Sequence, residues 1–200
     1  MPGTLVLGTT NRKKGLELAE LVRPLGIAVQ TLTDFPQALS VDETGNSFAD
    51  NARLKAQQQA MHLGQWVLAD DSGLCVDALD GTPGIYSARF AGPDAGDEDN
   101  NRLLLERLAG VPPERRGAHY VCHVTLADPQ GTIRAESHGS CHGRILDTRQ
   151  GSGGFGYDPL FEIVEYHRSF GLLSPVVKAC ISHRARAMRQ ILPEIARLLG

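Results

Sequence analysis

The segment WVLADDSG, residues 66–73, constrains the fold of this chain more than any other. Its first four residues form a short apolar run that is typical of a buried strand, and two adjacent carboxylates follow. Adjacent carboxylates repel each other, and neither is cheaply desolvated without a partner. The next two residues, Ser-Gly, predict a turn before a second apolar run begins at Leu74. Two interpretations stay open: a divalent cation binds Asp70 and Asp71, or the pair simply occupies a turn.

Size and charge narrow the class of protein. The chain has 200 residues, 42% of them hydrophobic, which is enough to bury one substantial core and predicts a single domain over residues 1–200. A net charge of -3 argues against a nucleic-acid partner, because duplex binders usually carry a basic excess. No apolar run is long enough to cross a bilayer, so we expect no membrane partner. The four cysteines form no CxxC pair and no signal segment precedes the first strand, which predicts reduced thiols and a cytoplasmic location.

The beginning of the chain predicts a strand, a polar turn and a helix. Residues 5–7 are apolar, residues 8–11 read Gly-Thr-Thr-Asn, and helical apolar spacing continues over residues 12–25. Backbone N–H groups at a helix start, followed by Lys13 and Lys14, favour an anion such as phosphate. The alternative is an ordinary N-cap with solvated lysines.

A second strand is predicted over residues 27–32, and a second helix begins at Ser47. Asn51 and Lys55 lie beside the apolar stripe of that helix. Lys55 therefore has two interpretations, since its ammonium can either extend to water or contact a ligand. Glu43, just upstream, is a third acidic side chain able to converge on the acidic pair.

Period-two alternation over residues 118–141 predicts a β-hairpin around the turn Asp-Pro-Gln-Gly at residues 128–131. Four histidines alternate along it, and we assign no metal to them because exposed strand histidines are far commoner than metal ligands. The sequence GSGGFGYDP, residues 151–159, interleaves glycines with two aromatic side chains. Glycine lets the backbone approach a ligand closely, and an aromatic ring gives a nucleobase a stacking surface.

With these motifs together, the sequence resembles the inosine/xanthosine triphosphate pyrophosphatase family, whose members hydrolyse non-standard purine nucleotides. The resemblance covers nearly the whole chain and is specific because several short motifs occur in one order. Those motifs are TTNRKK at 9–14, ETG at 43–45 with Phe48 and DNA at 50–52, ADDSGL at 69–74, PGIYSAR at 83–89, GGFGYDP at 153–159, and Lys178 with ISHR at 181–184. The chain departs from the family at Asp50, where Glu is usual, and over residues 167–177, which lack the usual Lys- and Glu-bearing stretch.

For the architecture we expect an α/β fold with a mixed, twisted central sheet flanked by helices, and two lobes with an active-site cleft between them. The resemblance implies a homodimer. It also implies Mg²⁺-dependent hydrolysis of noncanonical purine nucleoside triphosphates, namely ITP, dITP, XTP and dXTP, to the monophosphate and pyrophosphate.

The resemblance further implies roles for particular residues. Asp71 would be the proton acceptor and a Mg²⁺ ligand, and Glu43 would help to hold the metal. The residues implied to hold the triphosphate are Thr9, Thr10, Asn11, Arg12, Lys13, Lys14 and Lys55. The residues implied to contact the rest of the nucleotide are Ser72, Phe155, Gly156, Tyr157, Asp158, Lys178, His183 and Arg184.

The chemistry implied is attack of water on the α-phosphorus of the nucleotide. Proton acceptance and metal binding compete at Asp71, because a metal-bound carboxylate is a poor base. Lys178, His183 and Arg184 can donate to a 6-oxo purine but would meet the 6-amino group of adenine donor to donor. Two other functions stay open: a nucleotide-binding regulator without catalysis, and a Mg²⁺-dependent phosphatase of sugar or nucleotide monophosphates.

Overall fold

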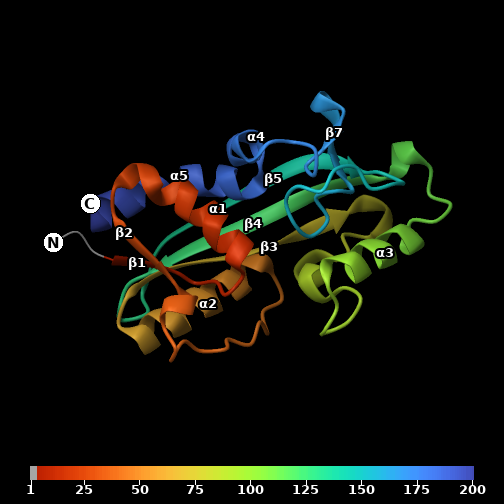
Figure 1. Cartoon of the computed structure of the whole chain (residues 1–200). Helices are drawn as coiled ribbons and strands as arrows, with labels where there is room; N and C mark the ends of the chain where they lie inside the picture. The colour runs from red at the N-terminus through yellow and green to blue at the C-terminus, as the bar shows by residue number, and fades with distance from the viewer. Residues whose placement is uncertain (1–3) are drawn as a thin grey trace. The chain divides into compact units, whose positions relative to one another are not determined.

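A computed structural model describes residues 4–200 and contains, within them, a seven-stranded mixed sheet (Figure 1). The strand order is β2-β1-β3-β4-β5-β6-β7. β1 pairs in parallel with β2 and β3, whereas β6 pairs antiparallel with β5 and β7. The predicted α/β class with a mixed sheet is therefore confirmed. The strands are β1 (Thr4–Leu7), β2 (Ala28–Thr31), β3 (Trp66–Val76), β4 (Gly117–Ala127), β5 (Ile133–Ile145), β6 (Phe161–Ile163) and β7 (Arg168–Ser169).

The described chain divides into two compact units, and the long strands β3, β4 and β5 each run through both. Unit 1 holds the chain up to Asp71 together with residues 122–139 and 184–200, and unit 2 holds residues 72–121 and 140–183. The predicted cleft between two lobes and the predicted single domain stay predictions. The α-helices are α1 (Arg12–Val22), α2 (Phe48–Leu63), α3 (Asp97–Arg107), α4 (Pro175–Ile181) and α5 (His183–Leu199).

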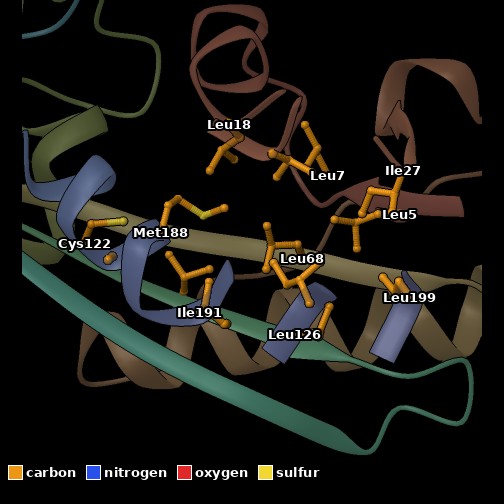
Figure 2. Close-up of a cluster of buried hydrophobic side chains, with 14 residues drawn as sticks. Leu5, Leu7, Leu18, Ile27, Leu68, Cys122, Leu126, Met188, Ile191 and Leu199 are labelled. Atoms are coloured by element: carbon orange, nitrogen blue, oxygen red, sulfur yellow. The ribbon is translucent and has the colours of Figure 1, made fainter. Parts of the chain in front are cut away.

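In unit 1, helices cover both faces of the sheet: α1 and α5 lie on one face and α2 on the other (Figure 1). Leu68 of β3 packs against Leu18 of α1 and Ile191 of α5 in a buried cluster (Figure 2). Its neighbours Val67 and Ala69 pack into a second cluster with the alanines of α2. Successive strand side chains point to opposite faces, so each buried face of β3 takes every second residue.

β3 continues as one strand through the acidic pair, and the turn predicted at residues 72–73 is wrong. A glycine inside a strand costs roughly 0.5–1 kcal/mol relative to alanine. Burial of Leu74 and Val76, which are both fully buried in the core of unit 2, contributes roughly 1.5–3 kcal/mol for each side chain. Tertiary packing therefore outweighs the local turn preference, and the chain turns only over Asp77–Leu79.

Two predicted local signals, a helix cap and a hairpin, are confirmed. The Ser47 side chain caps α2 by accepting from the Asp50 N–H. The hairpin predicted over residues 118–141 is formed by β4 and β5. Within the described part of the chain no helix is long and apolar enough to cross a membrane. All four cysteines are free thiols.

Candidate active site

The start of α1 is closed by its own N-cap. Asn11 Oδ1 accepts from the backbone N–H groups of Lys13 and Lys14, at 3.0 and 3.1 Å, and the Asn11 N–H donates to Thr9 Oγ1 at 3.1 Å. The N-cap that the sequence left as an alternative is therefore present. Lys14 is not a solvated lysine, however, because its Nζ lies 3.7 Å from Asp70 Oδ2.

A hollow of about 230 Å³ lies along α1, and its lining includes Thr9, Thr10, Asn11 and Arg12. The lining residues that α1 supplies, at positions 12, 15, 16 and 19, share one face of the helix. Lys14 lies on the opposite face, so the residues predicted to hold a triphosphate do not all point to one place.

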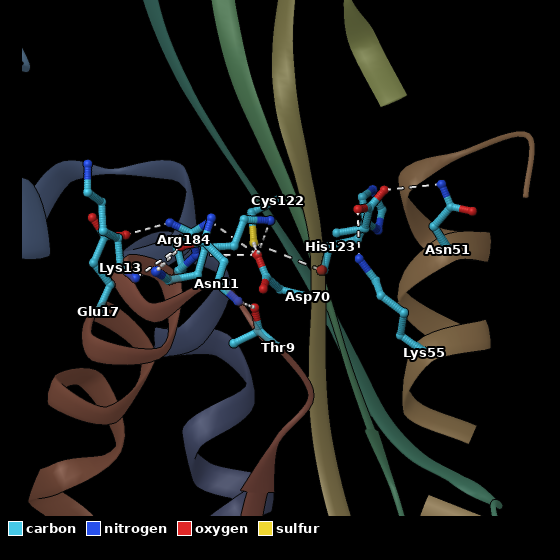
Figure 3. Close-up of polar contacts among 12 residues, drawn as sticks. Thr9, Asn11, Lys13, Glu17, Asn51, Lys55, Asp70, Cys122, His123 and Arg184 are labelled. Atoms are coloured by element: carbon cyan, nitrogen blue, oxygen red, sulfur yellow. Dashed lines mark hydrogen bonds and ion pairs between the residues drawn. The ribbon is translucent and has the colours of Figure 1, made fainter. Parts of the chain in front are cut away.

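Asp70 lies on the α1 and α5 side of β3 and is fully buried (Figure 3). Arg184 of α5 donates to Asp70 Oδ2 from Nε and Nη2, at 3.3 and 3.2 Å, and from Nη1 to Glu17. Burial alone would raise the pKa of Asp70, but Lys14, Arg184 and Lys55 together hold it well below its usual value. Asp70 is therefore an ionised carboxylate at neutral pH, held by the buried Arg184 and by the partly exposed Lys14.

Arg184 thus has a role that the sequence did not predict, which is to neutralise Asp70. The residue is only 1% exposed. The Asp70 carboxylate opposite it raises the pKa of the guanidinium, although burial acts in the other direction. A direct contact of Arg184 with a nucleobase stays a prediction.

Asp71, the next residue of β3, points to the opposite face of the strand, where its carboxylate contacts side chains of α2. Lys55 Nζ donates to Asp71 Oδ1 at 2.8 Å and to Glu43 Oε1 at 3.5 Å. Asn51 Nδ2 donates to Asp71 Oδ2 at 3.3 Å. Burial raises the pKa of Asp71 and the nearby Glu43 carboxylate adds to this, although Lys55 acts in the other direction.

The loop that carries Glu43 is fixed to the same helix. Asn51 Oδ1 accepts from the Gly45 N–H at 2.8 Å, so one amide side chain holds both Asp71 and this loop. A Cβ added at Gly45 would lie 2.6 Å from the Asp50 Cβ and 2.7 Å from Asn51 Oδ1. Only glycine fits there, which explains the Glu-Thr-Gly sequence.

The acidic side chains of unit 1 fit a magnesium ion. Among residues 4–200, no three His, Cys, Asp or Glu side chains form a complete metal cage. Mg²⁺ does not need one, because it usually binds one or two carboxylates together with water and substrate phosphates. Asp71 and Glu43 supply two such carboxylates around a single ammonium. In addition, Asp70 Oδ1 is buried and has no hydrogen-bond partner within the described chain.

A second group of predicted residues lies in unit 2, around Asp158. Lys178 Nζ donates to Asp158 Oδ2 at 2.6 Å, and the Phe155 N–H donates to the same oxygen at 2.8 Å. The Lys178 ammonium also lies 4.6 Å from the centre of the Phe155 ring. A Cβ at Gly154 would overlap the Asp158 carboxylate, so this loop conformation requires glycine at that position.

Two further rings complete the second group. The His183 ring stacks on Tyr120, with ring centres 4.6 Å apart and planes 11° from parallel. Tyr157 Oη donates to the Ser87 backbone carbonyl at 2.8 Å. Burial, aided by Asp97, raises the pKa of Tyr157 and keeps its hydroxyl protonated as a donor.

The predicted site residues therefore form two groups, each within one unit. The group in unit 1 is Thr9, Thr10, Asn11, Arg12, Lys13, Lys14, Glu43, Lys55, Asp71 and Arg184. The group in unit 2 is Ser72, Phe155, Gly156, Tyr157, Asp158, Lys178 and His183. The sequence analysis gave no site role to Asn51 or Glu17, and it considered Asp70 only as a ligand of one divalent cation together with Asp71. Strand alternation would have separated the two, because it places adjacent carboxylates on opposite faces.

Two carboxylates beside a lysine suit a protein that binds a phosphorylated ligand, because Mg²⁺ is held by one or two carboxylates together with substrate phosphates. The model of the Ham1 family matches residues 5–194, and the chain belongs to this family. It is 51% identical to the dITP/XTP pyrophosphatase of Rhodopirellula baltica, over 98% of this chain and 94% of that protein. It is 48% identical to the dITP/XTP pyrophosphatase of Desulforamulus reducens, over 97% and 96%.

Solved structures agree with this family. A HAM1 protein from Coxiella burnetii matches with a TM-score of 0.87 and 35% identity, over 97% of this chain and 98% of that one. The Staphylococcus aureus Ham1 protein matches with a TM-score of 0.84 and 34% identity, over 96% and 97%. The fold and the family are thus supported along nearly the whole length of the chain.

Proposed function

We propose that this protein hydrolyses noncanonical purine nucleoside triphosphates, of the dITP, ITP and XTP type, to the monophosphate and pyrophosphate. Relatives named dITP/XTP pyrophosphatase support the substrate class, at 51% and 48% identity over nearly the full length. The observation that carries the proposal is the cluster in which one ammonium, Lys55 Nζ, contacts both Asp71 and Glu43. Such a cluster combines a carboxylate for proton transfer with positive charge for phosphate.

Asp71 and Glu43 would hold Mg²⁺. When bound, Mg²⁺ would neutralise charge on the phosphate oxygens and on the departing pyrophosphate. Lys55 and Lys14 add fixed positive charge where negative charge develops. Metal binding and proton acceptance are alternative roles for Asp71, because a carboxylate that holds the metal is a poor base. For accepting the proton of the attacking water, the raised pKa of Asp71 is better suited than the lowered pKa of Asp70. Asn51 keeps the Asp71 carboxylate in a fixed orientation.

The residues of unit 2 are proposed to select the base. Phe155 offers a ring for stacking, and Lys178 and His183 are donors suited to the 6-oxo group of hypoxanthine or xanthine. The 6-amino group of adenine would meet these donors with a donor of its own, which disfavours ATP. We further propose a homodimer that works in the cytoplasm, where its four free thiols stay reduced. Light scattering on the purified protein tests the dimer.

The decisive experiment incubates the protein and Mg²⁺ with ITP, dITP, XTP, GTP and ATP, and identifies both products. We expect monophosphate and pyrophosphate from ITP, dITP and XTP, and much slower turnover of ATP. Release of orthophosphate would instead indicate a phosphatase that attacks the terminal phosphorus. Nucleotide binding without any product would indicate a regulator, and either result would refute the proposed function.

A further inference from the structure

Helix α3 holds the loop at residues 151–159 of unit 2 in place through hydrogen bonds to Gly156. The Gly156 N–H donates to Asp97 Oδ2 at 2.8 Å, and Asn101 Nδ2 donates to the Gly156 carbonyl oxygen at 2.8 Å. Both polar groups of one peptide residue are therefore bound by side chains one turn apart on the same helix.

Asn101 is placed for this task and not for contact with water. It is 2% exposed, and its Nδ2 group makes a second hydrogen bond, to the Asp97 carbonyl oxygen at 2.6 Å. Two carbonyl acceptors fix which end of the amide is the nitrogen. Asn101 Oδ1 is buried without a hydrogen-bond partner in the described residues. Burying the Oδ1 acceptor without a donor costs free energy. The two hydrogen bonds that Nδ2 donates therefore explain why a polar side chain is present here.

On its other side, the loop is fastened through Asp158. Asp158 Oδ2 accepts from the Phe155 N–H and from Lys178 Nζ. Phe155 thus lies between two fixed points, Asp158 and Gly156, and is itself only half-buried. A half-buried ring with its backbone held on both sides is a preorganised stacking surface, because little loop entropy is lost when a ligand binds to it.

We propose that Asp97 and Asn101 are positioning residues that set the Phe155 ring for stacking on the purine base. This inference rests on the proposed function. Base-aromatic stacking contributes mainly to binding, so loss of the α3 bonds raises KM for dITP and leaves kcat nearly unchanged. The effect passes entirely through Phe155.

The helix offers a matched control for each residue. Asn100 is also an asparagine, is 3% exposed and makes two hydrogen bonds, but to the backbone of Ala88 and Ala91. Asp99 lies in the same first turn as Asp97 and pairs with Arg102 at 2.8 Å. Replacing a control residue by alanine removes similar hydrogen bonds and similar charge near the helix start, but leaves Gly156 fastened.

The experiment compares Asn101→Ala with Asn100→Ala, and Asp97→Ala with Asp99→Ala, in steady-state hydrolysis of dITP. We expect KM to rise about tenfold in Asn101→Ala and about fivefold in Asp97→Ala, with kcat within about threefold, and both controls within about twofold of wild type. In a Phe155→Ala background, Asn101→Ala should raise KM no further, because contacts that act through one group are not additive. Asp97 is exposed, so its variant tests the inference even if Asn101→Ala folds poorly.

Amide hydrogen exchange at Gly156, measured by NMR, supplies a readout that needs no substrate. Exchange should be about tenfold faster in Asp97→Ala and unchanged in Asp99→Ala. Equal KM effects in variants and controls would overturn the positioning role, and so would an Asn101→Ala effect on KM that persists in the Phe155→Ala background. In either case, turnover of dITP by the wild-type protein would still uphold the proposed function. A wild-type protein inactive on every nucleotide would refute the proposed function, and with it any role of these residues in base binding.

Discussion

Asp70 and Asp71 are neighbours in the sequence but belong to different environments on the two sides of β3. Asp70 is buried against Lys14 and Arg184. Asp71 shares the single ammonium of Lys55 with Glu43. The surroundings lower the pKa of Asp70 and raise that of Asp71. One strand thereby carries a fixed negative charge and a carboxylate suited to proton transfer, and strand alternation alone keeps them apart.

This difference shows how the protein itself offsets the charge of an acidic pair. Each carboxylate has its own cation on its own face, so the mutual repulsion expected from the sequence is offset within the protein. Burying an ion pair seldom stabilises a fold, but removing one partner of such a pair is strongly destabilising. We therefore expect substitutions at Asp70 to affect folding, and substitutions at Asp71 to affect turnover.

The largest effect is predicted for Asp71→Asn. The variant keeps the shape of the side chain but removes the proton acceptor, so kcat for dITP should fall at least about 10³-fold, or about 4 kcal/mol. Thermal unfolding followed by circular dichroism should change little, because Glu43 still faces Lys55. Near wild-type turnover in a folded Asp71→Asn protein would remove Asp71 from the mechanism.

Asp70→Asn is predicted to act in the opposite way, on stability. It removes the carboxylate that Nε and Nη2 of the buried Arg184 guanidinium contact, although Glu17 still accepts from Nη1, and the free energy of unfolding should fall by about 3 kcal/mol. Urea unfolding at pH 7 measures this loss. The double variant Asp70→Asn/Arg184→Met should recover part of it, since no buried charge is then left uncompensated. Unchanged stability in Asp70→Asn would contradict the expectation that Asp70 affects folding whereas Asp71 affects turnover.

Lys55→Met tests the ammonium that Asp71 and Glu43 share. We expect kcat for dITP to fall about 10²-fold, because a fixed positive charge near the reacting phosphate is lost. Arg53→Met is the control: Arg53 lies on the same helix, but its guanidinium pairs with Glu136 at 2.7 Å. A Lys55→Met enzyme with the activity of the control would show that Lys55 has no part in catalysis.

The sequence predicted two acidic turns, and only one of them forms. At residues 128–131 the chain turns as predicted, and the Asp128 carboxylate accepts from the N–H groups of Gln130 and Thr132, both at 3.0 Å. At residues 70–73 the same kind of sequence stays extended, because β3 is a central strand whose apolar side chains before and after this segment, at residues 67–69 and at 74 and 76, are buried in packed clusters. Local chemistry decides a turn at the end of a hairpin, whereas tertiary packing decides it within a central strand.

In the candidate site, too, the sequence predicts contacts between residues that are near one another in the chain better than contacts between distant ones. Asp71, Glu43 and Lys55 were predicted together from motifs near one another in the sequence, and the structure places them in contact. The pairing of Asp70 with Arg184 joins residues 114 positions apart. No local pattern carries that information, and the role of Asn101 in holding Gly156 was hidden for the same reason.

The smallest predicted effect uses Asp128 as a buried carboxylate outside the site. Burial would raise its pKa, but the N–H of Thr132, Arg134 and the N–H of Gln130 together lower it from the ordinary 3.8. The folded state therefore favours the ionised form. The resulting stabilisation is fully present above about pH 4 and is lost as the pH falls through the lowered pKa.

Asp128→Asn should accordingly lower the free energy of unfolding by about 1 kcal/mol at pH 7. The difference from wild type should shrink steadily below about pH 4, because the wild-type carboxyl then becomes neutral as well. Urea unfolding of both proteins between pH 3 and pH 7 measures this, with dITP turnover at pH 7 as the control for an unchanged site. A difference that stays constant over this range would show that the turn depends on the shape of the Asp128 side chain. A difference that depends on pH would show that the charge of Asp128 is stabilised by backbone N–H groups. The charge of Asp70 is stabilised instead by two cations, Lys14 and Arg184.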